Sequence, residues 1–386
     1  MRKVICQRLS SHRSALATNS TSVLIDTHMK LRNICYYDKE GKSIYLPEPR
    51  PQNPCLCGSG RKSKSCCLKD SKTGYWFPPE CITKTPDPKT GFSHKKCYAR
   101  SLMDCCSKIS REHYISESVL QVIGKKKDLL ASGFPQQEPN VEELMSTNSL
   151  ASKILCQRHN SALSPLDADA KRLVATLRAF DRRFGVLPSP KGFGNSVSLQ
   201  SNEFELFNGH NIERWMLKTL CGFLASKNVR IKGKKIIEFQ IKHSWLEILF
   251  GMQPSPNGCG LYVIPSTTYT YDSFGFTPLI FEKRINEAVD YTPIIKLEDR
   301  TNVYVHGAQL EITGFKFLLS VTGLMPDEYK PIKQYRPLKL VFTDGSSYKV
   351  IHFGWNDPSL KQVVTLEHTG RYSGRPPDQL GFASRS

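Results

Sequence analysis

Four cysteines gathered in one short stretch are the residues of this chain best suited to chemistry. Cys55 and Cys57 form one pair, and the adjacent Cys66 and Cys67 form a second. Two close pairs of thiolates suit the tetrahedral geometry that zinc prefers. Glycines between the pairs allow so short a loop to fold back on itself. The spacing predicts a structural zinc knuckle over residues 51–70, and the alternative is a set of unrelated buried cysteines.

The run from Pro54 to Cys67 resembles the SEC-C motif, which is best known from the tail of the SecA translocation ATPase. Ser63 departs from the motif, which usually carries an aromatic residue at this position. By analogy with the SecA tail, the resemblance implies that the knuckle docks on a protein partner. Such a knuckle is an accessory element, and its presence does not identify a catalysed reaction.

A second group of chemically capable residues lies between residues 97 and 160. Three thiolates and an imidazole can hold a structural zinc ion, and the candidates are Cys97, Cys105 or Cys106, Cys156 and His159. Cys105 is preferred to Cys106, and His94 is a possible substitute ligand. A carboxylate and an amide oxygen suit a hard cation such as Mg²⁺, and a neutral histidine can accept a proton near pH 7. The candidates for this second chemistry are Glu112, His113 and Asn160.

The pair Glu112-His113, followed by the run Cys156-x-x-His159-Asn160, resembles the HNH nuclease family. The resemblance implies a treble-clef ββα-metal finger in which His113 is the general base and Glu112 and Asn160 hold one Mg²⁺ or Mn²⁺ ion. It also implies that the zinc ion is purely structural. The cysteine spacing and the CxxH pair depart from the family pattern, and Asn148 is only a loose match to its middle Asn. The resemblance is therefore to a divergent branch.

The charge of the chain points to a phosphate-rich partner. The net charge is +19, and residues 1–190 hold 31 Lys and Arg against 17 Asp and Glu. A basic half that also carries the metal-type cysteines is typical of a protein that binds a nucleic-acid backbone, here expected to be DNA. A basic surface without a partner is the alternative.

The cysteine distribution and the absence of apolar runs predict a cytoplasmic protein. Eleven of the 13 cysteines precede residue 160, and the first residues lack the apolar stretch of a secretory signal. No apolar run reaches the ~18 residues that a membrane helix needs. We therefore expect a soluble, cytoplasmic protein, of bacterial or phage type, without a membrane partner.

The pattern of elements predicts an α+β protein. We expect a partly ordered leader (1–50), the SEC-C zinc knuckle (51–70), the HNH-like finger (92–186), a C-terminal α+β domain (196–368) and a flexible tail (369–386). The C-terminal domain is expected to have one amphipathic helix and mostly antiparallel strands. Gly-Asn-rich residues near 191–195 mark its boundary, and no motif assigns it a role.

Two helices and several strands are expected. One helix begins at Ser164 and Pro165 and carries a basic face, Lys171, Arg172, Arg178 and Arg182, that is either solvated or tracks a nucleic-acid backbone. Asn211 is expected to cap a second helix with an apolar stripe over 212–224. Strands are expected at 236–239, 245–250, 261–265, 279–281 and 309–321, with a hairpin over 338–353.

Two functions are compatible with these residues. The first is a metal-dependent HNH-type endonuclease that hydrolyses phosphodiester bonds. The second is a non-catalytic, zinc-dependent module that binds nucleic acid or a protein. Retention of cleavage after His113→Ala would argue against the first, and binding without product would favour the second.

Overall fold

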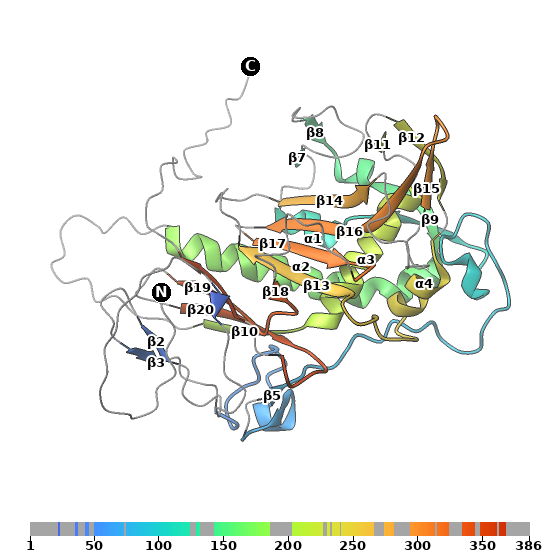
Figure 1. Ribbon diagram of the computed structural model, residues 1–386. Coiled ribbons are helices and arrows are strands. Elements are labelled where there is room, and N and C mark those ends of the chain that lie inside the picture. The colour runs from blue at the N-terminus through green and yellow to red at the C-terminus, as the bar shows by residue number, and fades with distance from the viewer. Residues whose placement is uncertain are drawn as a thin grey trace, which may run out of the picture.

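The computed structural model describes residues 22–23, 35–37, 43–45, 50–72, 75–123, 129–131, 143–185, 203–226, 230–231, 234–239, 241–265, 274–281, 294–312, 315–323, 334–343, 348–360 and 363–367. The predicted boundary at 191–195 and the tail 369–386 lie outside the described residues. Within the described part, the chain is a mixed α+β protein with mostly antiparallel sheets (Figure 1).

The larger sheet is antiparallel throughout. In spatial order, its strands are β11 (Arg230–Ile231), β12 (Lys234–Phe239), β15 (Ile294–Leu297), β16 (Asn302–Ile312), β17 (Phe315–Ser320), β13 (Gly260–Pro265) and β18 (Gln334–Tyr335), with β14 (Phe274–Phe281) paired to β16. The predicted strand 309–321 is in fact two strands. Ile312 pairs with Phe315, so the chain reverses between β16 and β17.

A smaller sheet contains two parallel pairs. Its order is β1 (Ser22–Val23), β21 (Val363–Glu367), β19 (Lys339–Thr343), β20 (Tyr348–Gly354) and β10 (Glu203–Asn208). The expected hairpin within 338–353 is confirmed, because β19 and β20 pair antiparallel from Lys339 with His352 to Thr343 with Tyr348. The parallel pairs are β10 with β20 and β19 with β21.

Four two-stranded ribbons complete the described strands. They are β2 (Cys35–Tyr37) with β3 (Ser43–Tyr45), β4 (Leu68–Asp70) with β5 (Tyr75–Trp76), β6 (Ile109–His113) with β9 (Ala151–Cys156), and β7 (Leu129–Ala131) with β8 (Glu143–Met145). The described helices are α1 (Glu117–Ile123), α2 (Gln157–Gly185), α3 (Gly209–Ala225) and α4 (His243–Leu249), with 3₁₀ turns η2 (Ser63–Ser65), η3 (Arg100–Leu102) and η4 (Thr147–Leu150).

The long helix α2 begins earlier than the cap pattern predicted. It starts at Gln157, so Pro165 lies inside the helix and Ser164 is not its cap. Proline has no N–H to donate to the carbonyl one turn back. The hydroxyl of Ser164 donates instead to the Ser161 carbonyl at 2.9 Å, which supplies that carbonyl with a partner. The helix therefore continues through the proline.

The basic face predicted for α2 is largely engaged within the protein. Arg172 lies over the ring of Phe207, 3.8 Å from its centroid, and pairs with Glu205 at 3.1 Å. Arg178 is buried and donates to the Val122 carbonyl. The reading of these two arginines as a solvated or backbone-tracking face is wrong, because both stabilise packing between elements.

Helix α3 is buried around nearly its whole circumference. Its cap is Asn208, whose side chain accepts from the Asn211 N–H at 3.2 Å, and not Asn211 itself. The predicted strand at 245–250 is also wrong. Trp245, Leu246 and Leu249 are buried at the spacing of a helix face rather than in alternation, and they form the inner side of α4.

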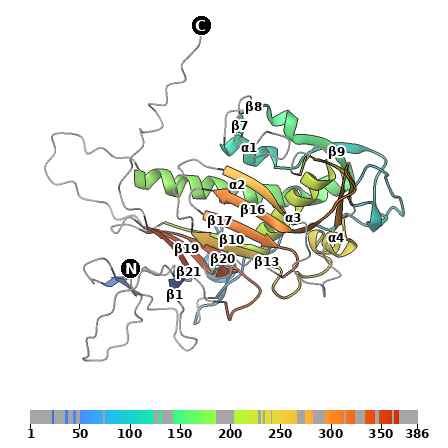
Figure 2. The same cartoon turned by 45° about the horizontal axis from the view of Figure 1, so that its top comes forward.

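One hydrophobic core joins the finger region to the larger sheet. Leu166 of α2, Phe223 of α3 and Phe317 of β17 belong to the same buried cluster. Tyr114, next to β6, meets the Phe223 ring edge-on at 4.8 Å. Helices α2 and α3 lie together against one side of the sheet (Figure 2). The finger region and the C-terminal region are therefore held together by shared packing.

Candidate metal centres

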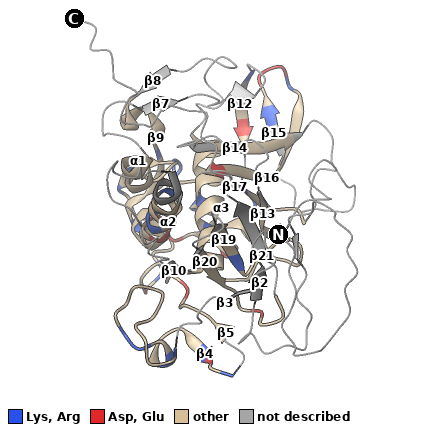
Figure 3. Cartoon of the chain, turned by 90° about the vertical axis from the view of Figure 1, so that its left-hand side faces the viewer, with Lys and Arg blue, Asp and Glu red and all other residues tan. Residues whose placement is uncertain are grey.

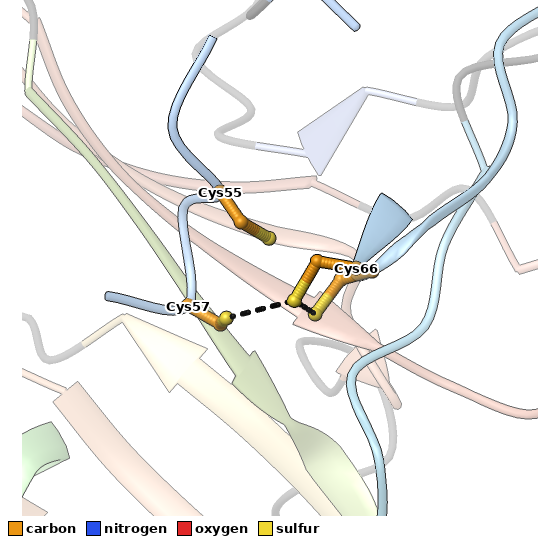
Figure 4. Close-up of side chains that lie close together, drawn as sticks. Cys55, Cys57 and Cys66 are labelled. Carbon is orange, nitrogen blue, oxygen red and sulfur yellow. Dashed lines mark hydrogen bonds between the residues drawn. The ribbon is translucent and has the colours of Figure 1, made fainter. Parts of the chain in front are cut away.

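The first candidate centre is the knuckle. The sulfur atoms of Cys55, Cys57, Cys66 and Cys67 lie within 4.8 Å of one another (Figure 4). The separations are 3.6 Å for Cys57 and Cys66 and 3.5 Å for Cys66 and Cys67. Zn–S bonds of about 2.3 Å in a tetrahedron place sulfurs about 3.8 Å apart. The four thiols therefore fit one zinc ion.

The backbone of the knuckle explains how four ligands fit so short a loop. Gly58 and Gly60 have φ values of 78° and 71°, which side-chain-bearing residues rarely adopt. The Cys55 N–H donates to the Arg61 carbonyl at 2.7 Å and closes the loop. Ser63 is fully buried, and its hydroxyl donates to the Asn53 carbonyl at 3.1 Å. Ser63 therefore ties the second half of the loop to the residues that precede Cys55.

The surroundings of Cys66 favour the thiolate form that zinc binds. Its slight burial acts to raise the pKa of Cys66. Hydrogen bonds from Ser59 and from the neighbouring thiols outweigh that effect and lower the pKa to about 6. The Arg61 guanidinium also donates to this sulfur at 3.3 Å.

The knuckle packs against the smaller sheet. The Leu206 N–H of β10 donates to the Leu56 carbonyl at 3.1 Å. Leu68, Trp76 and Leu206 form a small core with the buried cysteines. The knuckle therefore has its own core, separate from the main one.

The second candidate centre joins the loop around η3 to the junction of β9 and α2. The ligand atoms of Cys97, Cys105, Cys156 and His159 lie within 4.8 Å of one another, and all four residues are buried. The His159 Nδ1 atom is 3.5, 3.8 and 3.2 Å from the sulfurs of Cys97, Cys105 and Cys156. These separations also fit a tetrahedral zinc ion. A hydrogen bond from Cys97 and a second from His159 lower the pKa of Cys156 to about 3, in spite of burial.

The geometry separates the ligand candidates that the spacing left open. Cys105 is in the cluster, whereas Cys106 donates to the Lys108 carbonyl and accepts from the Arg158 N–H, both at 3.3 Å. His94 is outside the cluster, and its Nδ1 accepts from the Lys96 N–H at 3.1 Å.

The structure brings Glu112 and Asn160 together next to the second centre. Glu112 lies on β6 and Asn160 in the first turns of α2, and the Asn160 side chain hydrogen-bonds the carboxylate.

His113 faces Thr147 and forms a hydrogen bond with its backbone. Its Nε2 atom is buried and has no hydrogen-bond partner within the described part of the chain. Burial lowers the pKa of His113, which keeps the ring neutral near pH 7. The backbone carbonyl of Asn148 accepts a hydrogen bond from the Arg111 guanidinium at 2.9 Å.

A lysine that sequence reasoning missed lies beside Glu112. The Lys218 Nζ atom is 2.6 Å from Glu112 Oε1 and 2.6 Å from Asp167 Oδ2. The lysine side chain is 3% exposed and that of Glu112 is 8% exposed. Burial acts to lower the pKa of Lys218, but the Asp167 and Glu112 carboxylates outweigh it and raise the pKa. Burial raises the pKa of Glu112 against the opposing effect of Lys218.

Further hydrogen bonds fix this ion-pair network. Ser116 donates its hydroxyl to Asp167 and accepts from the Trp215 indole at 2.9 Å. Lys218 and Trp215 both come from α3, so the network ties the finger to the C-terminal region. A signal for Lys218 was present in the sequence, because charged residues interrupt the otherwise apolar helix over 212–224. A charge at such a position needs a buried partner.

The residues expected to hold Mg²⁺ or Mn²⁺ do not fit that ion in this arrangement. The ammonium of Lys218 already lies against Glu112, where the cation would bind. Mg²⁺ also keeps several waters, and the Glu112 carboxylate is buried. The two zinc-type clusters and the Glu112 site therefore differ: the clusters can accept an ion as they stand, and the Glu112 site cannot.

Comparison of the chain with protein-family models, curated proteins and solved structures finds no match. Among the described helices, none combines the length and the apolar character needed to cross a membrane.

Proposed function

We propose that this protein is a non-catalytic, zinc-organised module that binds nucleic-acid phosphates through its basic first half. The position of Lys218 supports the non-catalytic function over the nuclease. Its Nζ atom lies 2.6 Å from the Glu112 carboxylate, and both side chains are buried. The carboxylate that a hydrolase of the HNH type would use for a cation is already paired. Its role in this protein is to fasten the finger to α3.

Exposed basic residues on both zinc-bearing segments support the choice of ligand. Residues 50–72, which include the knuckle, carry one acidic residue, Asp70, and expose six cations: Arg50, Arg61, Lys62, Lys64, Lys69 and Lys72. The loop around the second centre exposes Lys84, Lys89, Lys95, Lys96, Arg100 and Lys108. Figure 3 shows blue segments on the loop beside β4. Cations spread over loops in this way can follow a phosphate backbone without reading its sequence.

The test is fluorescence anisotropy of a labelled DNA duplex over a range of salt concentrations. We expect binding that weakens steeply with salt, because each phosphate contact releases a counterion. Lys64→Glu should weaken binding and make the slope of log Kd against log salt shallower by about 0.9. Arg300→Glu is the matched control, since it makes the same charge change at an exposed position beyond β15. Equal effects of the two variants would refute the assignment of the surface.

An HNH-type endonuclease is the second candidate. The hydrogen bond between Glu112 and Asn160 and the unpartnered Nε2 atom of His113 favour it. Lys218 would have to release Glu112 before a cation could bind. The test is incubation with supercoiled plasmid in Mg²⁺ or Mn²⁺ beside His113→Ala. Nicking by the wild type and not by the variant would replace the non-catalytic proposal with the nuclease.

Docking of the knuckle on a protein, by analogy with the SEC-C motif, is compatible with either candidate. The deletion of residues 51–70 is its test, with loss of a protein partner but retention of the second zinc ion as the expected result.

A further inference from the structure

A cavity of about 450 Å³ lies in the C-terminal region, and its described lining includes none of the eight candidate zinc ligands. Its walls come from α3, α4, the chain that follows α4, and the end of β17. Pockets that bind small molecules have volumes of about 300 to 1,000 Å³ and mainly apolar walls. Leu217, Ile248, Leu319 and Val321 supply apolar surface here. The size and the lining are thus those of a ligand site.

The ring of Trp245 adds apolar surface to the wall. Trp245 lines the cavity and is 2% exposed. Its Nε1 atom is covered by protein, so the indole N–H is not open to a ligand in the cavity.

The charges of the wall exclude anions. The lining residues in the described part of the chain include Glu213 and Glu247 and no Lys, Arg or His. Glu213 is already satisfied, with Arg336 Nε at 2.8 Å, His210 Nδ1 at 3.2 Å and the Leu261 N–H at 2.8 Å. Glu247 remains half-exposed, and the Nε2 atom of His243 lies 3.7 Å from its carboxylate. A phosphate or carboxylate ligand would find no positive group in the wall.

We propose that this cavity is a binding site for a small, uncharged and mainly apolar molecule. The site is distinct from the basic surface proposed for nucleic acid, whose ligand is an anion. The two proposals can therefore fail separately.

The test uses coumarin as the probe, because it is uncharged and mainly apolar. Coumarin-3-carboxylate is the anionic counterpart. Binding to the full chain is followed by saturation-transfer NMR titration. We expect a Kd of about 1 mM for coumarin, as is usual for a molecule of this size. The carboxylate should bind at least about tenfold more weakly, since a buried anion would have no partner.

Two variants assign the binding to the cavity. Val321→Trp fills the space from a half-buried position and should abolish coumarin binding, whereas Ile237→Trp adds the same ring at an exposed position on β12 and should leave it unchanged. Circular dichroism establishes that each variant is folded.

The proposal is overturned if coumarin does not bind the wild type, or if Val321→Trp binds it as well as Ile237→Trp does. Equal affinity for coumarin and its carboxylate would overturn the charge argument. Neither result bears on duplex DNA binding, which the anisotropy experiment measures independently.

Discussion

Replacing Lys218 by methionine removes the ammonium that lies 2.6 Å from both Glu112 and Asp167. Methionine keeps most of the length and packing of the side chain, so the change is mainly electrostatic. Glu112 is 6% exposed and would be left as a buried carboxylate without its cation. Breaking a buried ion pair from one side costs about 3–5 kcal/mol. Because Asp167 is partly exposed and can be solvated, we expect the lower part of that range for the free energy of unfolding.

The pH dependence of this loss has a definite sign. Burial raises the pKa of Glu112 above that of an unfolded chain, so protonation favours the folded state. Removing Lys218 raises that pKa further. The stability that Glu112 contributes is therefore fully present below the pKa of its carboxyl in the unfolded chain. It falls as the pH rises through the pKa of this carboxyl in the folded protein. The deficit of the variant, relative to the wild type at the same pH, should shrink as the pH falls from neutral through the raised pKa of Glu112.

The assay is urea unfolding followed by tryptophan fluorescence, to which Trp215 contributes from inside the network. Lys171→Met, at an exposed position on α2, is the control and should change stability by less than about 0.5 kcal/mol. Adding Glu112→Gln to Lys218→Met should recover much of the loss, because no buried charge remains on Glu112. A cost below about 1 kcal/mol for Lys218→Met, or a cost independent of pH, would refute the role given to this network.

Three further predictions concern the metal centres and the packing. Cys156→Ser should lower the zinc content measured by plasma mass spectrometry from about two ions to about one per chain, while Cys106→Ser should leave it unchanged; equal losses would contradict the ligand assignment. Cys67→Ser should also remove one ion but shift the thermal midpoint less than Cys156→Ser, because the knuckle has a separate small core; equal midpoints would argue against that separation. Gly209→Ala should destabilise by about 1–3 kcal/mol in urea unfolding, because a Cβ there overlaps the buried Trp355 ring; wild-type stability would show that the ring can move aside.

The knuckle cluster could be predicted because its four candidate ligands are set by short-range spacing. Cys55 and Cys57 sit in one tight loop with Cys66 and Cys67, and two glycines with positive φ make that loop possible. The α+β class, the hairpin of β19 and β20 and the buried stripe of α3 follow from patterns of the same local kind. Local patterns misled where a long-range constraint acts. Helix α2 begins at Gln157, close to the zinc ligand His159, and the cap-like Ser164 lies within it.

The sequence by itself pointed to the four cysteines of the knuckle, since two thiol pairs so close in the chain lie in one short loop. The choice of Cys105 over Cys106, and the meeting of Cys105 with His159, came from the tertiary structure. Only the tertiary structure decided the state of Glu112, because its partner Lys218 lies on a helix far along the chain. Two charges attract strongly only after packing has removed the water between them. The spacing of residues in the sequence does not predict which charged pairs lose the water between them. The choice between a cation-binding carboxylate and a buried ion pair was therefore made by the packing of α3 against the finger.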